Sequence, residues 1–199
     1  MDSTLIQNEG IDELAREMGV YKQVAELTEQ AMQGKLPFKE SLPLRLKLLK
    51  GLTQAQIDAV KSRIKLTKGA RELIQTLKKQ GHLTAIISGG FDVLALPLQK
   101  ELQIDFLAIN QLKLKNGVFD GNCLEPIIDT QAKADSLIHF AKNAGIDLEN
   151  TVAIGDGSND AQMLKASGFG IAFCAKPKLK PFAKLCIDSP DLSEIIRLL

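Results

Sequence analysis

The run Gly155-Asp156-Gly157-Ser158-Asn159-Asp160 follows a short apolar segment and is the part of the sequence richest in reactive groups. Asp156 and Asp160 bring carboxylate oxygens to the end of a predicted strand, and the glycines let the backbone turn sharply beside a ligand. Such oxygens suit Mg²⁺, which is usually held by one or two carboxylates and keeps several waters. The alternative is an Asx-turn and a helix N-cap, in which the acids favour the helix dipole. The complete run favours a metal site.

A second polar strand end lies in the segment Ile86–Asp92, where an apolar run stops at Ser88 and two glycines precede a predicted helix. Backbone N–H groups at a helix N-terminus bind anions, and the Ser88 hydroxyl would add another donor. A P-loop would need a longer glycine loop that ends in Gly-Lys-Ser/Thr. The segment therefore indicates either an anion site or an ordinary tight turn between a strand and a helix.

Two isolated groups carry meaning only in combination with these strand ends. Lys133 lies at the start of a predicted helix, where a lone lysine is normally a solvated surface charge. If it faces the anion site, it can neutralise phosphate oxygens as a point charge. Asp2 and Thr4 stand at the start of the chain, and an isolated terminal aspartate would by itself indicate nothing.

The elements that must position these groups change in kind near residue 66. Beyond it, short apolar runs alternate with helical patterns, with strands expected at Leu83–Ser88, Phe106–Asn110 and Thr151–Gly155. Two more strands are expected at 169–173 and 184–187, and Asn116-Gly117 predicts a hairpin. This alternation predicts a doubly wound, Rossmann-like parallel sheet covered on both faces, whose carboxyl-terminal strand ends form the active site.

Before residue 66 the pattern is helical throughout, and no segment has the pattern typical of a strand. The segment Ile11–Gly19 is amphipathic and ends in glycine, Thr53 is a good N-cap, and Pro43 should break or kink the helix that contains it. We therefore expect an α/β core formed by residues 1–8 and 67–199, with a helical insertion at 9–66.

Composition excludes several classes of protein. Lys plus Arg (25) nearly balance Asp plus Glu (24) among the 199 residues, which argues against general nucleic-acid binding. Three scattered cysteines without a C-x-x-C pair argue against a zinc site or a disulfide framework. No apolar stretch is long enough to span a bilayer, so we expect no membrane partner and a soluble, cytoplasmic protein.

Taken together, the motifs resemble the haloacid dehalogenase (HAD) superfamily of phosphatases. In chain order these are Asp2-Ser3-Thr4, Ser88, Lys133 and the run from Gly155 to Asp160. Within that superfamily the chain looks like the phosphoserine phosphatases, and the likeness extends over nearly all of it. The stretches that carry this closer likeness are DSTLIQNEGIDELAREMGV, AMQGKLPFKESLPLRLKLLKG, SGGFD, NGVFDG, GDGSNDAQMLKASGFGIAFCAKP and DLSEII.

The resemblance implies Mg²⁺-dependent hydrolysis of O-phospho-L-serine through an aspartyl-phosphate, the last step of serine biosynthesis. Asp2 matches the general acid and base of the family, and Ser88 and Lys133 match further catalytic positions. The implied metal-binding residues are Asp2, through its backbone carbonyl, Asp156, and Asp160, which would orient the waters of the metal. The implied phosphate-binding residues are Ser88, Gly89, Lys133 and Asn159.

The same resemblance makes the helical insertion a cap that closes over the site and recognises the substrate. Glu9 matches the position that binds the serine ammonium, and Arg45 the position that binds its carboxylate. Met32 and Phe38 match apolar wall positions. Without the resemblance, these four residues would be interpreted as surface charges and ordinary core residues of a helix.

One departure from the family stands out. The family's nucleophilic aspartate would precede Met1, and so would an apolar strand that is usually central in the sheet, which would leave a slot in the core. Three hypotheses follow: the true product starts upstream and is a phosphoserine phosphatase; the chain is an inactive remnant; or it is a non-catalytic module that binds phosphoserine. A related small-molecule phosphatase or phosphotransferase is a further alternative, and a homodimer stays open.

Overall fold

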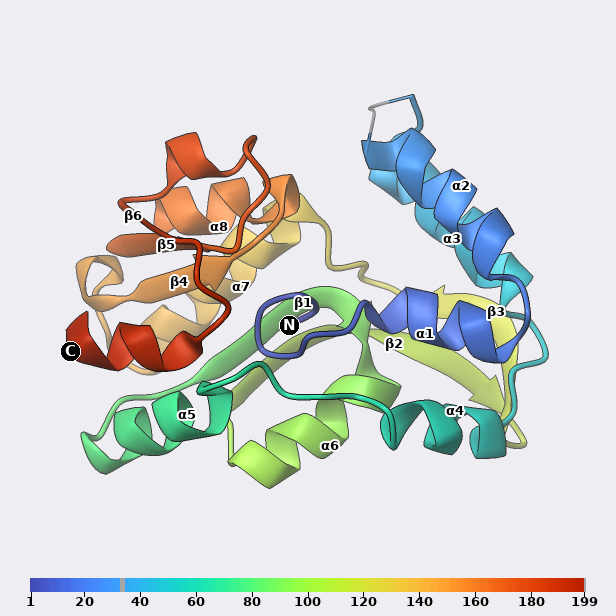
Figure 1. Cartoon of the computed structure of the whole chain (residues 1–199), viewed down its shortest axis with the longest axis horizontal. Helices are drawn as coiled ribbons and strands as arrows, with labels where there is room; N and C mark the ends of the chain where they lie inside the picture. The colour runs from blue at the N-terminus through green and yellow to red at the C-terminus, as the bar shows by residue number, and fades with distance from the viewer. Residues whose placement is uncertain (33–34, 199) are drawn as a thin grey trace.

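The computed structural model describes residues 1–32 and 35–198, which fold into an α/β core and a group of helices (Figure 1). The first four helices are α1 (Gly10–Glu17), α2 (Tyr21–Met32), α3 (Phe38–Leu48) and α4 (Gln54–Lys61). They occupy the segment in which the sequence predicted helices. Thr53 caps α4 as predicted, because its side chain accepts from the Gln56 amide and Gln56 bonds back.

The first sheet consists of β1 (Ala85–Phe91), β2 (Phe106–Lys115) and β3 (Val118–Leu124). Strands β1 and β2 are parallel, whereas β2 and β3 form an antiparallel hairpin. Asn116 and Gly117, the two residues of its turn, both have positive φ, as a two-residue hairpin turn of this kind requires. The predicted hairpin is therefore confirmed, and β2 is longer than the run expected at Phe106–Asn110.

The second sheet contains β4 (Val152–Gly155), β5 (Phe169–Phe173) and β6 (Leu185–Ile187), all parallel and in this order. Its strands coincide closely with three of the predicted runs. The expected parallel sheet therefore takes the form of two three-stranded sheets, and the described residues form no strand that joins β1 to β4.

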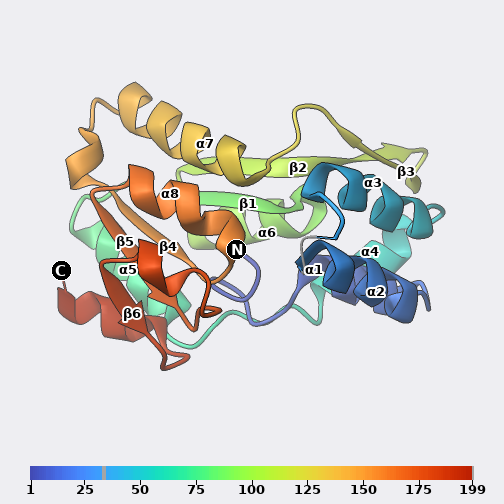
Figure 2. The same ribbon diagram turned by 90° about the horizontal axis from the view of Figure 1, so that it is seen from above.

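Four helices accompany the sheets: α5 (Ala70–Lys79), α6 (Asp92–Leu102), α7 (Thr130–Asn143) and α8 (Ala161–Ala166). Figure 1 shows α5 and α6 along one side of β1, and Figure 2 shows α7 along another side. Short 3-10 turns complete the described elements at Leu148–Asn150, Ser158–Asp160, Lys180–Phe182 and Leu192–Leu198. Helical cover on different sides of a largely parallel sheet agrees with the α/β class expected from the sequence.

The prediction that Pro43 breaks its helix is wrong. Helix α3 runs through Pro43 without interruption, and α6 likewise contains Pro97. Leu42 and Leu46, on either side of Pro43, are buried in a cluster shared with α1 and α4. Burial of this apolar face compensates the hydrogen bond that proline removes from the helix, because tertiary packing provides most helical stability.

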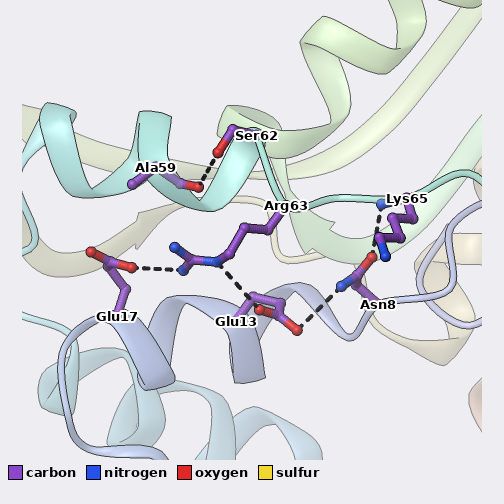
Figure 3. Close-up of polar contacts among 7 residues, drawn as sticks. All are labelled: Asn8, Glu13, Glu17, Ala59, Ser62, Arg63 and Lys65. Atoms are coloured by element: carbon purple, nitrogen blue, oxygen red, sulfur yellow. Dashed lines mark hydrogen bonds and ion pairs between the residues drawn. The ribbon is translucent and has the colours of Figure 1, made fainter.

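The two connections between the helical segment and the core lie side by side. The Asn8 side chain accepts from the Lys65 amide at 2.9 Å and donates to Glu13 at 3.2 Å. Arg63 reaches Glu17 at 2.6 Å and lies 4.0 Å from Glu13, so both connections are tied to α1 (Figure 3). This network lies where the helical segment joins the core.

Two further observations describe the molecule as a whole. A cavity of about 780 Å³ lies between β1 and β4 and is lined by residues of both strands and by Met1. Among the residues that the structure describes, none of the helices has the length and apolar character needed to cross a bilayer.

Candidate active site

The carboxyl ends of β1 and β4 meet the first residues of the chain. A Cβ built on Gly90 would lie 3.1 Å from an Asp2 carboxylate oxygen and 3.3 Å from the Ser88 hydroxyl oxygen. On the other side, the Thr4 hydroxyl donates to Asp156 at 3.2 Å. Residues that are far apart in the sequence therefore converge at one edge of the sheets, as the strand-end argument predicted.

The turn after β1 holds its polar groups in a fixed arrangement. Ser88 is buried, and its hydroxyl oxygen accepts the Gly90 amide at 3.0 Å. The Asn110 side chain donates to the Gly89 carbonyl at 2.8 Å and accepts from the Ile128 amide at 2.7 Å. Because Asn110 is fully buried, this pair of bonds ties the Ser88-Gly89 turn to the segment before α7.

Sequence reasoning did not single out Asn110. An amide side chain at the last position of the predicted strand Phe106–Asn110, where strand-end polar groups gather, was the available signal.

Lys133 and Asp160 form a buried ion pair. The Lys133 ammonium lies 2.7 Å from Asp160 Oδ1, and each of the two side chains is only 7% exposed. Asp160 Oδ2 accepts the backbone amides of Asp156 and Gly157, each at 3.2 Å. Lys133 is therefore not the solvated charge that a lone lysine at a helix start normally is. It is held by α7 against the loop that follows β4.

The pKa values of two carboxyl groups of the site, Asp2 and Asp156, are raised, which favours their neutral forms. Burial raises the pKa of Asp2 to about 7, Glu9 adds to the rise, and the terminal ammonium, the Gly10 amide and Lys133 oppose it. Asp2 Oδ1 is shielded from solvent and has no hydrogen-bond partner among the described atoms. Burial also raises the pKa of Asp156, and Asp160 and Glu9 add to this. Such crowding of acids is what a cation would relieve.

The oxygens present fit a hard cation only in part. Asp2 Oδ1 is buried and accepts no hydrogen bond among the described atoms, whereas one carboxylate oxygen of Asp156 accepts a hydrogen bond from Thr4. Both oxygens of Asp160 are engaged by Lys133 and by backbone amides. Across residues 1–32 and 35–198, no group of three or more His, Cys, Asp or Glu side chains is arranged to hold a metal. Of the three predicted metal-binding residues, Asp2 and Asp156 have the better placed oxygens, and Asp160 braces the loop.

The helical segment contributes one buried cation. Arg45 on α3 is buried, and its guanidinium bonds weakly to the Ser41 carbonyl at 3.4 Å and to the Thr28 hydroxyl at 3.5 Å. None of the ion pairs found within the described ranges joins Arg45 to a carboxylate. Burial lowers its pKa, which Asp12 and Glu9 partly offset. A buried guanidinium without an acidic partner is suited to receive an anionic ligand.

The remaining predicted residues are distributed around this centre. Phe38 lies above the anion turn, since its ring edge is 3.6 Å from a Cβ built on Gly89, and Arg45 lies 5.8 Å from its ring centre. Glu9 is exposed, caps the start of α1 by position, and accepts the Ser3 hydroxyl at 2.5 Å. Asn159 is exposed on the loop after β4. The side chain of Met32 lies outside the described residues.

One contact joins the helical segment to the core beside the site. Lys39 on α3 lies 3.0 Å from Asp129, the N-cap of α7. Sequence reasoning did not single out either residue, because a lysine and an aspartate 90 positions apart carry no pairing signal in a single sequence. The contact places α3 over the helix that carries Lys133.

Comparison with known proteins agrees with this geometry. The family model of haloacid dehalogenase-like hydrolases matches residues 1–165. A phosphoserine phosphatase of Methanocaldococcus jannaschii is 45% identical over 196 residues, covering 98% of this chain and 93% of its own. A phosphoserine phosphatase of Mycobacterium tuberculosis is 44% identical over all of this chain, which spans only 49% of that relative. A solved substrate-bound phosphoserine phosphatase complex superimposes with a TM-score of 0.94 at 44% identity, covering 100% and 95% of the two chains.

The fold and the site together define a hydrolase of the phosphatase type, built on a Rossmann-like α/β core with its reactive groups at the strand ends. The chain belongs to the haloacid dehalogenase-like hydrolase family.

Proposed function

We propose that this site binds O-phospho-L-serine and hydrolyses it to serine and phosphate. The observation that carries the proposal is a pair of half-sites that both lie near the ring of Phe38. One consists of the anion turn at Ser88 with the buried Lys133. The other is the buried Arg45, which forms no ion pair with a carboxylate among the residues that the structure describes. A phosphate monoester of an amino acid carries two anionic groups that suit these two half-sites: a phosphate for the anion turn and Lys133, and a carboxylate for Arg45. The proteins similar to this chain bear the same activity in their names.

The phosphoryl group would lie at the end of β1. The Ser88 hydroxyl and the Gly89 backbone amide would donate to its oxygens, and Lys133 would neutralise their charge. Asn159 would support the same group from the loop after β4. Phosphoryl transfer depends mainly on positioning and charge neutralisation, and the bonds of Asn110 and Asp160 hold the donors in place before a ligand arrives.

Asp2 is the group suited to move a proton in this reaction. Its pKa is raised to about 7, which lets the carboxyl group give a proton to the leaving serine oxygen and take one from water near neutral pH. Mg²⁺ is the cation that the backbone carbonyl of Asp2 and the carboxylate of Asp156 would hold, which leaves the Asp2 carboxyl group for proton transfer. When bound, it supplies charge stabilisation to the phosphoryl oxygens.

The cap residues would distinguish phosphoserine from other phosphate esters. Arg45 presents a planar guanidinium, whose two parallel donors match a carboxylate. Glu9 lies at the start of α1 and would attract the ammonium group of the substrate, while Phe38 covers the anion turn. Met32 stays a predicted wall residue. A cytoplasmic location and a homodimer likewise stay predictions from the sequence.

Formation of an aspartyl-phosphate needs a carboxylate at the position before Met1, which the 199 residues do not include. The test therefore compares two chains with Mg²⁺ and O-phospho-L-serine. One is the chain as given, and the other carries an apolar strand ending in aspartate, joined to Met1. Phosphate release and substrate binding are measured for both.

We expect both chains to bind phosphoserine and only the extended chain to release phosphate. A version of the extension that ends in asparagine is the matched control and should bind without turnover. Absence of phosphoserine binding by all three chains would overturn the proposed substrate. Equal turnover by the short and the extended chains would overturn the assignment of the nucleophile.

A further inference from the structure

Ser41 on α3 carries a buried hydroxyl that has no hydrogen-bond partner among the described atoms. The residue is fully buried, and its Oγ and Asp2 Oδ1 are the two side-chain atoms in this condition within residues 1–32 and 35–198. Native proteins leave few buried polar atoms unpaired, because each one costs the free energy of removing it from water. Asp2 belongs to the site already described, whereas the reaction as described so far gives Ser41 no role.

Helix α3 does not satisfy this hydroxyl itself. A hydroxyl in a helix can donate to the carbonyl four residues earlier, as Thr28 does to Val24 at 2.9 Å on α2, which packs against α3 (Figures 1 and 2). For Ser41 that carbonyl belongs to Pro37, and it accepts the backbone amides of Glu40 and Ser41 at 3.0 and 2.9 Å instead. Packing does not account for the hydroxyl either, since alanine would fill much the same space without burying a polar atom.

Ser41 lies on the side of α3 that faces the anion turn. Phe38, Ser41 and Arg45 are three and four positions apart, which places them on one side of a helix. The Phe38 ring lies 3.6 Å from a Cβ built on Gly89, so this side faces the turn that would hold the phosphate. The Arg45 guanidinium lies 5.8 Å from the same ring and reaches back to the Ser41 carbonyl at 3.4 Å. The unpaired hydroxyl and the guanidinium are therefore neighbours beside the proposed substrate site.

A carboxylate is the ligand group that suits both donors. Its two oxygens offer about four acceptor positions, and the fork of a planar guanidinium occupies two of them, which leaves a position for a hydroxyl. A hydrogen bond to a charged acceptor also contributes more than one to a neutral acceptor. The carboxylate of an amino-acid phosphate would bring such an acceptor to α3 while its phosphate lies at the anion turn.

We propose that the Ser41 hydroxyl is a specificity-determining donor, which binds the carboxylate of the substrate together with Arg45. This role rests on the proposed function and deepens it, because it adds a second group that distinguishes an amino-acid phosphate from an ester without a carboxylate. In the free protein the unpaired hydroxyl lowers stability, and in the complex it contributes to binding.

The test measures binding and stability of the full chain and of its Ser41→Ala variant. Calorimetry with Mg²⁺ gives the Kd of O-phospho-L-serine and of O-phosphoethanolamine, which keeps the phosphate and the ammonium group but has no carboxylate. We expect Ser41→Ala to raise the Kd of phosphoserine by about tenfold or more and to leave that of phosphoethanolamine unchanged. The urea midpoint of the free variant should stay the same or rise, because alanine removes an unsatisfied buried hydroxyl.

Ser167→Ala is the matched control. Ser167 is also buried, but its hydroxyl donates to the Leu164 carbonyl at 2.8 Å. Its removal should lower the urea midpoint, because a hydrogen bond that is made in the free protein is lost, and should change neither Kd. The two alanine variants therefore separate a hydroxyl used by the fold from one used by the ligand.

Three results would overturn the role of Ser41 alone. These are an unchanged Kd of phosphoserine in Ser41→Ala, an equal rise in Kd for both esters, and a urea midpoint that falls as it does in Ser167→Ala. In each case the unsubstituted chain still binds phosphoserine more tightly than phosphoethanolamine, so the proposed function stands. Absence of phosphoserine binding by the unsubstituted chain would overturn the proposed function and the role of Ser41 with it.

Discussion

The site has a core half, formed by the Ser88 turn with Lys133 and Asp160, and a cap half, formed by Arg45 on α3. The two halves differ in how their charged side chains are paired. In the core, Lys133 and Asp160 are paired at 2.7 Å, and Asp160 is further fixed by two backbone amides. In the helical segment, the buried Arg45 bonds weakly to Ser41 and Thr28, and among the described residues it forms no ion pair with a carboxylate. The core half is thus assembled in advance, whereas the cap half leaves its charge for a ligand. Under the proposed function, this difference means that the phosphate-binding groups are fixed by the core, whereas the group that selects the substrate is on the helices.

The largest effect is expected for Lys133→Met, which leaves the Asp160 charge buried without its partner. Breaking a buried pair costs about 3–5 kcal/mol, so the free energy of unfolding in a urea titration should fall by about that amount. Phosphoserine binding should fall as well. Lys142→Met, at the exposed end of the same helix, is the control and should change neither. An unchanged unfolding free energy in Lys133→Met would contradict the assembled core half.

Arg45→Lys tests the cap half with charge retained. The lysine cannot reproduce the planar pair of donors, so KM for phosphoserine in the extended chain should rise by roughly tenfold, about 1.4 kcal/mol, at nearly constant kcat. Arg71→Lys, in an exposed ion pair with Glu101, serves as the control and should leave KM unaltered. A fall in kcat without a change in KM would place Arg45 in the chemical step instead.

A smaller effect is expected at the contact between the halves. Lys39→Gln removes the ion pair with Asp129, whose lysine side chain is 73% exposed, so its contribution is at most about 1 kcal/mol. In the extended chain, KM should rise by a factor of roughly five or less. Salt at about 1 M should produce the same rise in the extended chain without this substitution, because it screens the pair. Lys22→Gln on α2 is the control. A salt-independent effect would show that the contact is not electrostatic.

The smallest expected effect is a pH-dependent change in stability. It comes from Asp191, a hydrogen-bonded carboxylate that lies away from the site. The Ser193 hydroxyl, followed by Lys68, holds the pKa of Asp191 at about 2. Because the folded pKa is depressed, the contribution of Asp191 to stability is present above its unfolded pKa of about 3.9 and is lost as pH falls toward 2. Side-chain carbon NMR should show its midpoint near 2. A midpoint near 4 would show that these bonds do not persist in solution.

Most of the secondary structure could be predicted from local sequence patterns. Thr53 caps its helix and Asn116-Gly117 turns its hairpin because both depend on a few neighbouring residues. The break predicted at Pro43 was wrong because the stability of this helix does not depend on neighbouring residues alone. Its helix is stabilised by packing against distant helices, which a local rule does not include.

The candidate site was predictable to the extent that it lies at strand ends. That rule brought together Ser88, Asp156 and Asp160, whereas the importance of Lys133 needed the family resemblance. The Lys133–Asp160 pair and the bonds of Asn110 join residues through folding, so a single sequence carried no signal for either geometry.

The most direct test of the central claim is phosphate release from O-phospho-L-serine by the chain extended with an apolar strand and aspartate, with Mg²⁺ present. Phosphothreonine and a phosphate ester without a carboxylate serve as comparison substrates. The account predicts turnover of phosphoserine, and loss of the preference for carboxylate-bearing esters in Arg45→Ala. Equal turnover of all three esters by the extended chain without further substitution, or no turnover of phosphoserine, would contradict it.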